Sequence, residues 1–236
     1  MNKQERKVLT EKTKQVLFLH GYLADRRSFA FQIPYFERDF EVFAPDMKGF
    51  GENKGMEKPY SLDDYILEMR EYMYKRGIKK PHVIAHSFGG RMAIKSASMD
   101  RELFNKIVLT GAAGLKPRTN LKKIIKKTTF NFLKSFVPKD RLTAFYSKDY
   151  LALDNVMKAS FIKIVSETLD DRLKDILNPT LIVFGDKDKE TPVYMAKRLN
   201  RGIVNSKLII IKDAGHFCFI DKRNKFNTEV KEFLLS

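Results

Sequence analysis

Six short apolar runs constrain the fold of this chain more than any other feature. Each is three or four residues long and apolar throughout, without the alternation of apolar and polar residues that a half-exposed strand shows. Such runs are typical of a parallel sheet whose two faces are both covered. The sequence therefore predicts an α/β protein with a mostly parallel sheet flanked by helices. The runs occupy residues 16–19, 42–44, 83–85, 107–109, 181–184 and 208–211.

Four of these runs end in turn-forming or reactive residues. In open α/β sheets, ligands bind beyond the carboxyl ends of the strands. We therefore expect the four clusters to meet at one crevice. They are His20-Gly21, Pro45-Asp46, the string 86–90 (His-Ser-Phe-Gly-Gly) and the string 185–188 (Gly-Asp-Lys-Asp).

One connection between the runs is much longer than the others. Most fit a single helix, as in residues 61–76, where Ser61 has the position of an N-cap before Asp63 and Asp64. Residues 112–179, in contrast, place 68 residues between two strands, a length that requires helices of its own. We predict an α/β core in 1–111 and 180–236, with a helical lid, 112–179, inserted over the crevice. The apolar faces of this lid are expected at Leu121, Ile124, Ile125, Phe132, Leu133, Phe136, Phe161, Ile164 and Val165.

Ser87 is the first candidate for chemistry. It follows a predicted strand and precedes a helix-compatible stretch, 91–97, which is the context of a nucleophile elbow. That tight turn needs small residues two positions before and two positions after the nucleophile. Ala85 and Gly89 meet this requirement.

A serine hydroxyl needs a base that removes its proton, and the chain has four histidines. His20 and His86 belong to other motifs and His82 precedes a strand, so we expect structural or solvent-facing roles for them. His216 follows the last predicted strand, on a loop that would open at the crevice. We therefore predict His216 as the general base.

A carboxylate must orient such a histidine and stabilise its cation. The loop after residues 181–184 offers Asp186, Asp188 and Glu190, which lie between Ser87 and His216 in the chain. The residues alone do not decide which of these three acids orients the histidine.

The order Ser, Asp, His and several strings around it resemble the α/β-hydrolase superfamily, in particular its serine-nucleophile, lid-bearing, carboxylesterase-like members. The similarity spans about residue 16 to the C-terminus, with the lid unmatched. The strings are His20-Gly21-Tyr22, His86-Ser87-Phe88-Gly89-Gly90, Phe184-Gly185-Asp186-Lys187-Asp188 with Thr191-Pro192, and Ala214-Gly215-His216-Phe217.

This resemblance implies roles for further residues. The family's acid corresponds to Asp188, which leaves Asp186 as a turn residue, and Ala85 stands where the family usually has glycine. An oxyanion hole would use the backbone N–H groups of Tyr22 and Phe88.

Three other positions complete the expected site. Gly21 and His86 flank the oxyanion-hole residues and are predicted to line the substrate pocket. Asp46 begins a string, 46–51, that resembles the family's Asp-x-x-Gly-x-Gly turn, and we expect a structural role for it.

The function these residues predict is hydrolysis of carboxylic esters or thioesters through an acyl-enzyme on Ser87. A lyase of the menaquinone-biosynthesis type and a carbon–carbon bond hydrolase would use the same triad and stay open, as does a non-catalytic ligand-binding protein on this fold. A serine at position 87 argues against haloalkane dehalogenases and epoxide hydrolases, which have an aspartate there.

The net charge of +16 raises the question of partners. Residues 116–148 hold ten basic side chains against Asp140 alone. A solvated lysine-rich face is the simplest interpretation, and an anionic substrate or, less favoured, contact with an anionic membrane surface are the alternatives. We expect a small ester-like substrate and no nucleic-acid partner, because basic residues are not interleaved with aromatic ones in a recognisable module. The oligomeric state does not follow from the sequence.

No metal or cofactor is expected. The chain has no His-Glu-x-x-His string, no cysteine pair and no calcium loop. The single cysteine, Cys218, and an N-terminal apolar run too short for a secretory signal lead us to expect a cytoplasmic protein. Cys218 itself is expected to be a small buried residue.

Overall fold

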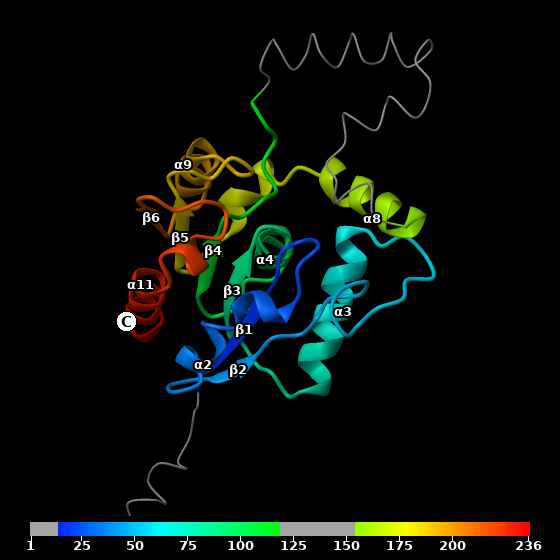
Figure 1. Ribbon diagram of the computed structural model, residues 1–236, viewed down its shortest axis with the longest axis horizontal. Helices are drawn as coiled ribbons and strands as arrows, with labels where there is room; N and C mark the ends of the chain where they lie inside the picture. The colour runs from blue at the N-terminus through cyan, green and yellow to red at the C-terminus, as the bar shows by residue number, and fades with distance from the viewer. Residues whose placement is uncertain (1–13, 119–153) are drawn as a thin grey trace, which may run out of the picture.

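The computed structural model describes residues 14–118 and 154–236 (Figure 1). Its centre is a sheet of six strands in the order β2-β1-β3-β4-β5-β6, and all neighbouring strands are parallel. At the carboxyl edge, Leu19 pairs with Ala85 and His86 pairs with Thr110. The strands are β1 (Gln15–Leu19), β2 (Glu41–Phe43), β3 (His82–His86), β4 (Ile107–Thr110), β5 (Thr180–Gly185) and β6 (Ser206–Ile211).

Helices cover both faces of the sheet. Successive strand residues point to opposite sides, so strands that are apolar throughout present apolar side chains on both faces. Leu17, Val83 and Ala85 pack with α3 (Leu62–Lys75), α4 (Phe88–Met99) and α9 (Val193–Gly202) in one apolar cluster. Phe18 and Ile84 face the other side. That side is covered by η1 (Arg26–Phe29), α2 (Ile33–Phe36), α10 (Cys218–Asp221) and α11 (Arg223–Leu235).

The predicted fold class is confirmed. Each of the six apolar runs lies in a strand, apart from Ala44 and with boundaries that differ by one or two residues. Helix α3 begins after Ser61, whose hydroxyl accepts from the Asp64 N–H while the Asp64 carboxylate accepts from the Ser61 N–H. This capping box starts the helix at the predicted N-cap, Ser61. His82 is the first residue of β3 rather than a residue before it, and it is buried.

The long connection 112–179 is described only in part. Its described end holds α8 (Asn155–Ser166) and a 3₁₀ helix, η3 (Asp170–Asp175). Of the expected apolar face, Ile164 is buried, Phe161 is half-buried and Val165 is exposed. The expected faces from Leu121 to Phe136 lie outside the described residues.

Helix α8 is bound to the core through its polar atoms. The Tyr60 N–H donates to Ser160 Oγ at 2.9 Å, and the Tyr22 hydroxyl donates to the Met157 carbonyl at 2.8 Å. Figure 1 shows α8 beside the amino-terminal end of α3. Within the described ranges, no helix has the length and the apolarity that crossing a membrane would require.

Candidate active site

Ser87 occupies a sharp turn between β3 and α4. Its backbone has φ 49° and ψ −106°, in a region that residues other than glycine rarely adopt. Two hydrogen bonds hold the turn, from the Ser87 N–H to the Thr110 carbonyl (3.1 Å) and from the Ala113 N–H to the Ser87 carbonyl (3.1 Å). The first turn of α4 approaches β1 so closely that a Cβ on Gly89 would lie 2.3 Å from the Leu19 carbonyl oxygen. This is the geometry of a nucleophile elbow.

Asp188 and His216 meet beside this turn. Asp188 Oδ2 lies 2.9 Å from His216 Nδ1, and both side chains are buried. The carboxylate also accepts from the N–H groups of Glu190 (2.9 Å) and Thr191 (2.8 Å) and from the Thr191 hydroxyl (2.8 Å). Burial opposes ionisation of Asp188, but the bonds from His216 and Thr191 outweigh it, so the pKa of this carboxyl lies below its ordinary value.

Asp186 lies at the same loop but faces away from the imidazole. Its side chain is exposed, and its Oδ1 accepts from the Ala214 N–H at 3.3 Å. The structure therefore brings Asp188, and not Asp186, to His216.

The second ring nitrogen of His216 faces a third acid. His216 Nε2 lies 3.3 Å from Glu190 Oε2, whose side chain is 67% exposed. Within the described part of the chain, the Ser87 hydroxyl forms no hydrogen bond. Catalytic hydrogen bonds are often long without substrate and shorten when it binds.

His86 lies behind the imidazole of His216 rather than at the cavity wall where we expected it. The two rings are 4.7 Å apart, and His86 Nε2 lies 3.2 Å from the His216 carbonyl. Burial lowers the pKa of His86 to about 3, so the ring is neutral. Gly21 also lies outside the cavity lining, because it packs against the elbow: a Cβ there would lie 2.9 Å from His86 Nδ1 and 3.5 Å from Ser87 Cβ.

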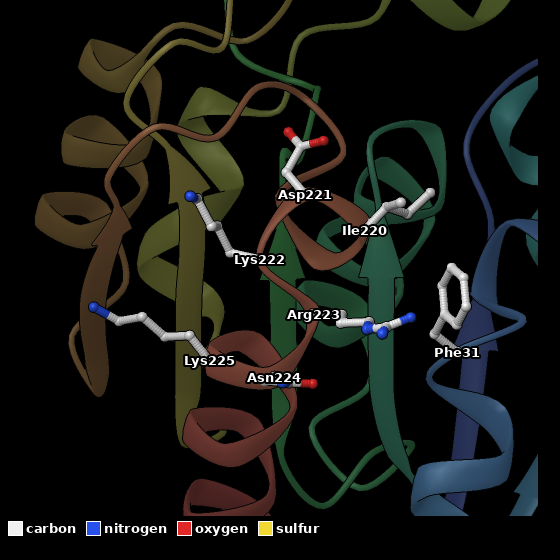
Figure 2. A pocket seen from close by; sticks show the side chains of 7 residues that line it. All are labelled: Phe31, Ile220, Asp221, Lys222, Arg223, Asn224 and Lys225. Carbon is white, nitrogen blue, oxygen red and sulfur yellow. The ribbon is translucent and has the colours of Figure 1, made fainter.

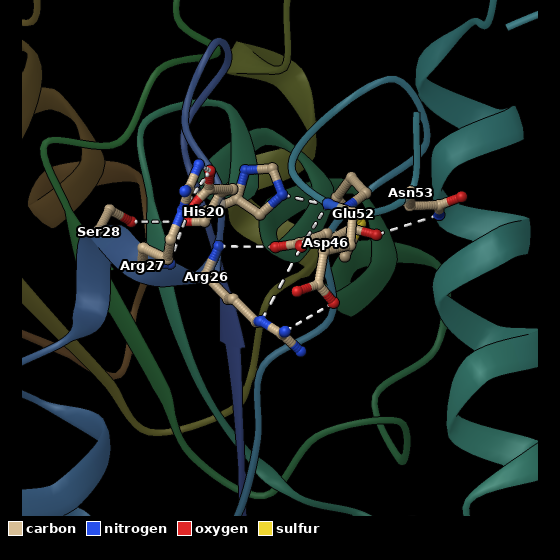
Figure 3. Close-up of polar contacts among 9 residues, drawn as sticks. His20, Arg26, Arg27, Ser28, Asp46, Glu52 and Asn53 are labelled. Atoms are coloured by element: carbon tan, nitrogen blue, oxygen red, sulfur yellow. Dashed lines mark hydrogen bonds and ion pairs between the residues drawn. The ribbon is translucent and has the colours of Figure 1, made fainter. Parts of the chain in front are cut away.

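A buried histidine connects the loop after β1 to the loop after β2. His20 Nε2 accepts from the Met47 N–H (2.9 Å), so Nδ1 carries the proton and donates to the Gly21 carbonyl (2.8 Å). Asp46 supports the same region by accepting from the N–H groups of Arg26 (2.8 Å) and Glu52 (2.9 Å), as Figure 3 shows. These contacts agree with the structural roles expected for His20 and Asp46, and they hold the loop that carries Tyr22.

A cavity of about 190 Å³ opens at Ser87. Phe88 begins α4 at this cavity, and the first N–H groups of a helix have no partner within the helix. Helix α8 supplies one wall. The lining residues are Tyr22, Ser87, Phe88, Arg91, Ala113, Phe161, Ile164, Val165, Glu190 and Thr191.

A larger hollow of about 630 Å³ lies elsewhere, around the turn between α10 and α11 (Figure 2). It contains none of the residues predicted for the site. Ser87 therefore lies at the smaller cavity, and Asp188 and His216 are buried next to its lining residue Thr191. The larger hollow is lined by Phe31, Ile220, Asp221, Lys222, Arg223, Asn224 and Lys225.

Two residues at the site, Gly111 and Arg91, were not singled out from the sequence, and the contacts of Glu190 and Thr191 were not foreseen. Glu190 and Thr191 belong to the acid loop, and Thr191 donates to Asp188 from the segment 185–192 that carried the family resemblance. Gly111, at φ 51°, backs the imidazole, since a Cβ there would lie 3.0 Å from His216 Nδ1. Arg91 lies one helical turn after Ser87, a spacing that could have marked it as a neighbour of the nucleophile.

No cluster of three or more potential metal ligands exists among the His, Cys, Asp and Glu residues of 14–118 and 154–236. Cys218 is buried beside Thr110, and burial raises the pKa of its thiol to about 11. Thiolate chemistry at this residue is therefore disfavoured.

Comparison with known proteins agrees with this architecture. The chain is 25% identical to the AB hydrolase superfamily protein YisY of Bacillus subtilis, over 93% of this chain and 91% of the relative. It is 24% identical to the 2-hydroxy-6-oxo-6-(2'-aminophenyl)hexa-2,4-dienoic acid hydrolase of Metapseudomonas resinovorans, over 94% and 84%. The fold resembles that of an esterase from Exiguobacterium antarcticum with a TM-score of 0.76 and 22% identity, covering 94% of this chain and 92% of that one.

A sequence model of the alpha/beta hydrolase family matches residues 16–228. That range includes the nucleophile elbow, the acid loop and the histidine loop. The chain therefore belongs to the alpha/beta hydrolase family.

Proposed function

We propose that this protein is a serine hydrolase that cleaves carboxylic esters or thioesters through an acyl-enzyme on Ser87. The observation that carries the proposal is the contact of 2.9 Å between Asp188 and His216 beside an elbow that places Ser87 at a cavity. A base oriented by an acid next to a serine on a strained turn is the arrangement that activates a hydroxyl.

In the proposed mechanism, Ser87 Oγ attacks the ester carbonyl while His216 Nε2 accepts its proton. Asp188 holds the proton on Nδ1 and stabilises the imidazolium, and it stays ionised because its pKa is low. The backbone N–H groups of Tyr22 and Phe88 are assigned to the oxyanion, with stabilisation on the order of 10² to 10³ in rate for each donor. His216 then protonates the leaving alcohol or thiol, and water hydrolyses the acyl-enzyme by the same steps.

A lid role for α8 is part of this proposal. The helix lies within 112–179 and contributes Phe161, Ile164 and Val165 to the wall of the Ser87 cavity. Covering the reacting carbonyl with apolar side chains strengthens electrostatic interactions at the site.

Hydrolysis of a carbon–carbon bond is a second candidate. It is supported by the relative from Metapseudomonas resinovorans, whose name describes the hydrolysis of a 2-hydroxy-6-oxo dienoic acid. The same three side chains would serve this reaction.

The deciding experiment is labelling with a fluorophosphonate, followed by a panel of p-nitrophenyl esters of different acyl length. We expect labelling of the wild type, no labelling of Ser87→Ala and weak labelling of His216→Ala. Ser98→Ala, a change elsewhere on α4, is the matched control and should label like the wild type. A Ser87→Ala variant as active as the wild type would contradict the assignment. Labelling without turnover of any ester would favour the carbon–carbon alternative, to be tested with 2-hydroxy-6-oxo dienoic acids.

A further inference from the structure

A buried cation lines the cavity of the proposed nucleophile. Arg91 lies on α4 one turn after Ser87, and its side chain is 9% exposed. Arg91 Nη1 donates to the carbonyls of Ile164 (2.9 Å) and Glu167 (2.8 Å), at the carboxyl end of α8. These two bonds use both hydrogens of one terminal nitrogen and leave the rest of the guanidinium available.

The remaining donors of Arg91 lie on its Nε and Nη2 atoms. Neither atom has a hydrogen-bond partner among the described residues, and neither is a fully enclosed polar atom. Since Arg91 is part of the cavity wall, these two atoms are its candidates for contact with a bound ligand. The Nε and Nη2 hydrogens form the parallel pair that binds both oxygens of a carboxylate.

The charge of Arg91 is also less fully paired than that of its neighbour Lys95, since Glu167 acts on Arg91 only from beyond ion-pair distance. Lys95, one turn further along α4, is buried to a similar degree and has Asp63 at 2.6 Å and Glu167 at 2.8 Å. Arg91 has no carboxylate within ion-pair distance in the described part of the chain. Burial of a charge that no carboxylate contacts directly is costly, so an anion that enters the cavity would gain from meeting it.

We propose that the Nε–Nη2 edge of Arg91 binds a carboxylate of the substrate, so that the substrates are esters or thioesters whose acyl part carries a second, free carboxylate. The inference rests on the proposed function, because it takes Ser87 as the residue that attacks the ester. It names a ligand contact and a substrate class for that site.

The charges at the cavity also orient such a substrate. Glu190 lies beside His216 at the reacting end and repels a carboxylate there. Arg91 attracts the carboxylate to itself, while Phe161, Ile164 and Val165 offer apolar contact to the carbon chain of the substrate. A cavity of about 190 Å³ suits a short chain of carbons.

The test compares two ester series, p-nitrophenyl half-esters of glutaric and adipic acid and the same compounds with the free carboxyl methylated. Spontaneous hydrolysis of the half-esters is subtracted with enzyme-free blanks. The measured quantity is the ratio of kcat/KM for the half-ester to kcat/KM for its methylated counterpart. We expect this ratio to fall on the order of 10- to 100-fold in Arg91→Gln, the effect of losing hydrogen bonds between charged groups.

Two further variants separate recognition from packing. Arg91→Lys keeps a cation but not the paired donors, so the ratio should fall less than in Arg91→Gln. Lys95→Gln removes a buried cation that also contacts the end of α8, and its ratio should equal that of the wild type. If the ratio is unchanged in Arg91→Lys and Arg91→Gln, or falls equally in Lys95→Gln, the proposal is wrong.

A binding measurement decides the inference independently of catalysis. Calorimetry on Ser87→Ala with monomethyl glutarate should show binding that weakens on the order of 10-fold or more when Arg91→Gln is added. Dimethyl glutarate should bind equally to both proteins. Equal binding of monomethyl glutarate to Ser87→Ala with and without Arg91→Gln would overturn the Arg91 assignment. If the wild type neither turns over esters nor is labelled at Ser87, the proposed function is wrong. The binding measurement would then still decide whether Arg91 binds a carboxylate.

Discussion

At the scale of single residues, the two aspartates of the acid loop offer a matched pair of substitutions. Asp188→Asn should reduce kcat for a p-nitrophenyl ester by about 10³- to 10⁴-fold, because an amide neither holds the Nδ1 tautomer of His216 nor stabilises its cation. Asp186→Asn should leave kcat within about twofold, because the one hydrogen bond of the Asp186 side chain within the described residues is with the Ala214 N–H. Steady-state kinetics on the two variants checks this. A larger loss in Asp186→Asn would transfer the orienting role to that residue.

A second prediction at this scale concerns Glu190, whose carboxylate lies 3.3 Å from His216 Nε2. Glu190→Gln removes the negative charge that faces an incoming carboxylate. Since the side chain is mostly exposed, the effect should be small, about a two- to fivefold increase in kcat/KM for the glutaric and adipic half-esters at low ionic strength.

The salt dependence of the Glu190 effect provides the control. The increase should shrink in high salt, because an exposed charge is screened. Glu229→Gln, on α11 and outside the lining of the Ser87 cavity, should leave kcat/KM for the half-esters unchanged. An increase of equal size for the methylated esters would show that the effect is not one of charge.

At the scale of elements, the attachment of α8 depends on a buried hydroxyl. Ser160 is fully buried, accepts from the Tyr60 N–H and donates to the Val156 carbonyl. Ser160→Ala leaves the Tyr60 N–H without this acceptor, so the free energy of unfolding should fall by about 1–2 kcal/mol. Ser166→Ala, in the same helix, removes an exposed hydroxyl whose hydrogen bond in the described structure is to the Ile162 carbonyl, and should cost less than about 0.5 kcal/mol.

Urea unfolding of the two serine variants measures both values. If Ser160→Ala and Ser166→Ala lost equal stability, the bond between α8 and the loop before α3 would not contribute. If the folded Ser160→Ala variant has a lower free energy of unfolding but is labelled at Ser87 like the wild type, the attachment of α8 can be weakened without loss of the elbow.

At the scale of the whole molecule, buried neutral histidines predict how stability depends on pH, with the largest pKa shifts at His82 and His86; burial lowers the pKa of His20 as well, in the same direction. Burial, with Lys106 and Lys14 nearby, lowers the pKa of His82 to about 4, and burial with His216 nearby lowers that of His86 to about 3. In the unfolded chain each of these rings has a pKa near 6.5, so it gains a proton as the pH falls below that value, while the same ring in the native protein stays neutral. Stability therefore falls as pH drops below about 6.5.

The expected slope is about 1.4 kcal/mol per pH unit for each histidine between roughly pH 6 and 4. Urea unfolding at pH 7, 6 and 5 measures it. His82→Leu should reduce the slope by about one histidine's share, since His82 has no hydrogen-bond partner in the described structure for either ring nitrogen. A slope equal to that of the wild type would mean that His82 is protonated in the native state.

The amino-acid sequence by itself determined the fold class, the sheet and the elbow, because these depend on local patterns. Uninterrupted apolar runs form buried parallel strands, Ser61 and Asp64 cap a helix through their own backbone, and Ser87 stands where a strand changes to a helix. The position of His216 after the last strand also follows from the order of elements.

Only the tertiary structure decided which side chains meet. Asp186 and Asp188 are two residues apart, and the turn at Gly185 directs one to solvent and the other to His216, a difference that composition does not carry. Arg91 and Lys95 are equivalent in a helical pattern, yet within the described residues carboxylates from α3 and the end of α8 form ion pairs with Lys95 and not with Arg91. Contacts between elements distant in the chain determine which charge is paired, and for that reason the difference between Arg91 and Lys95 follows from the tertiary structure and not from the sequence.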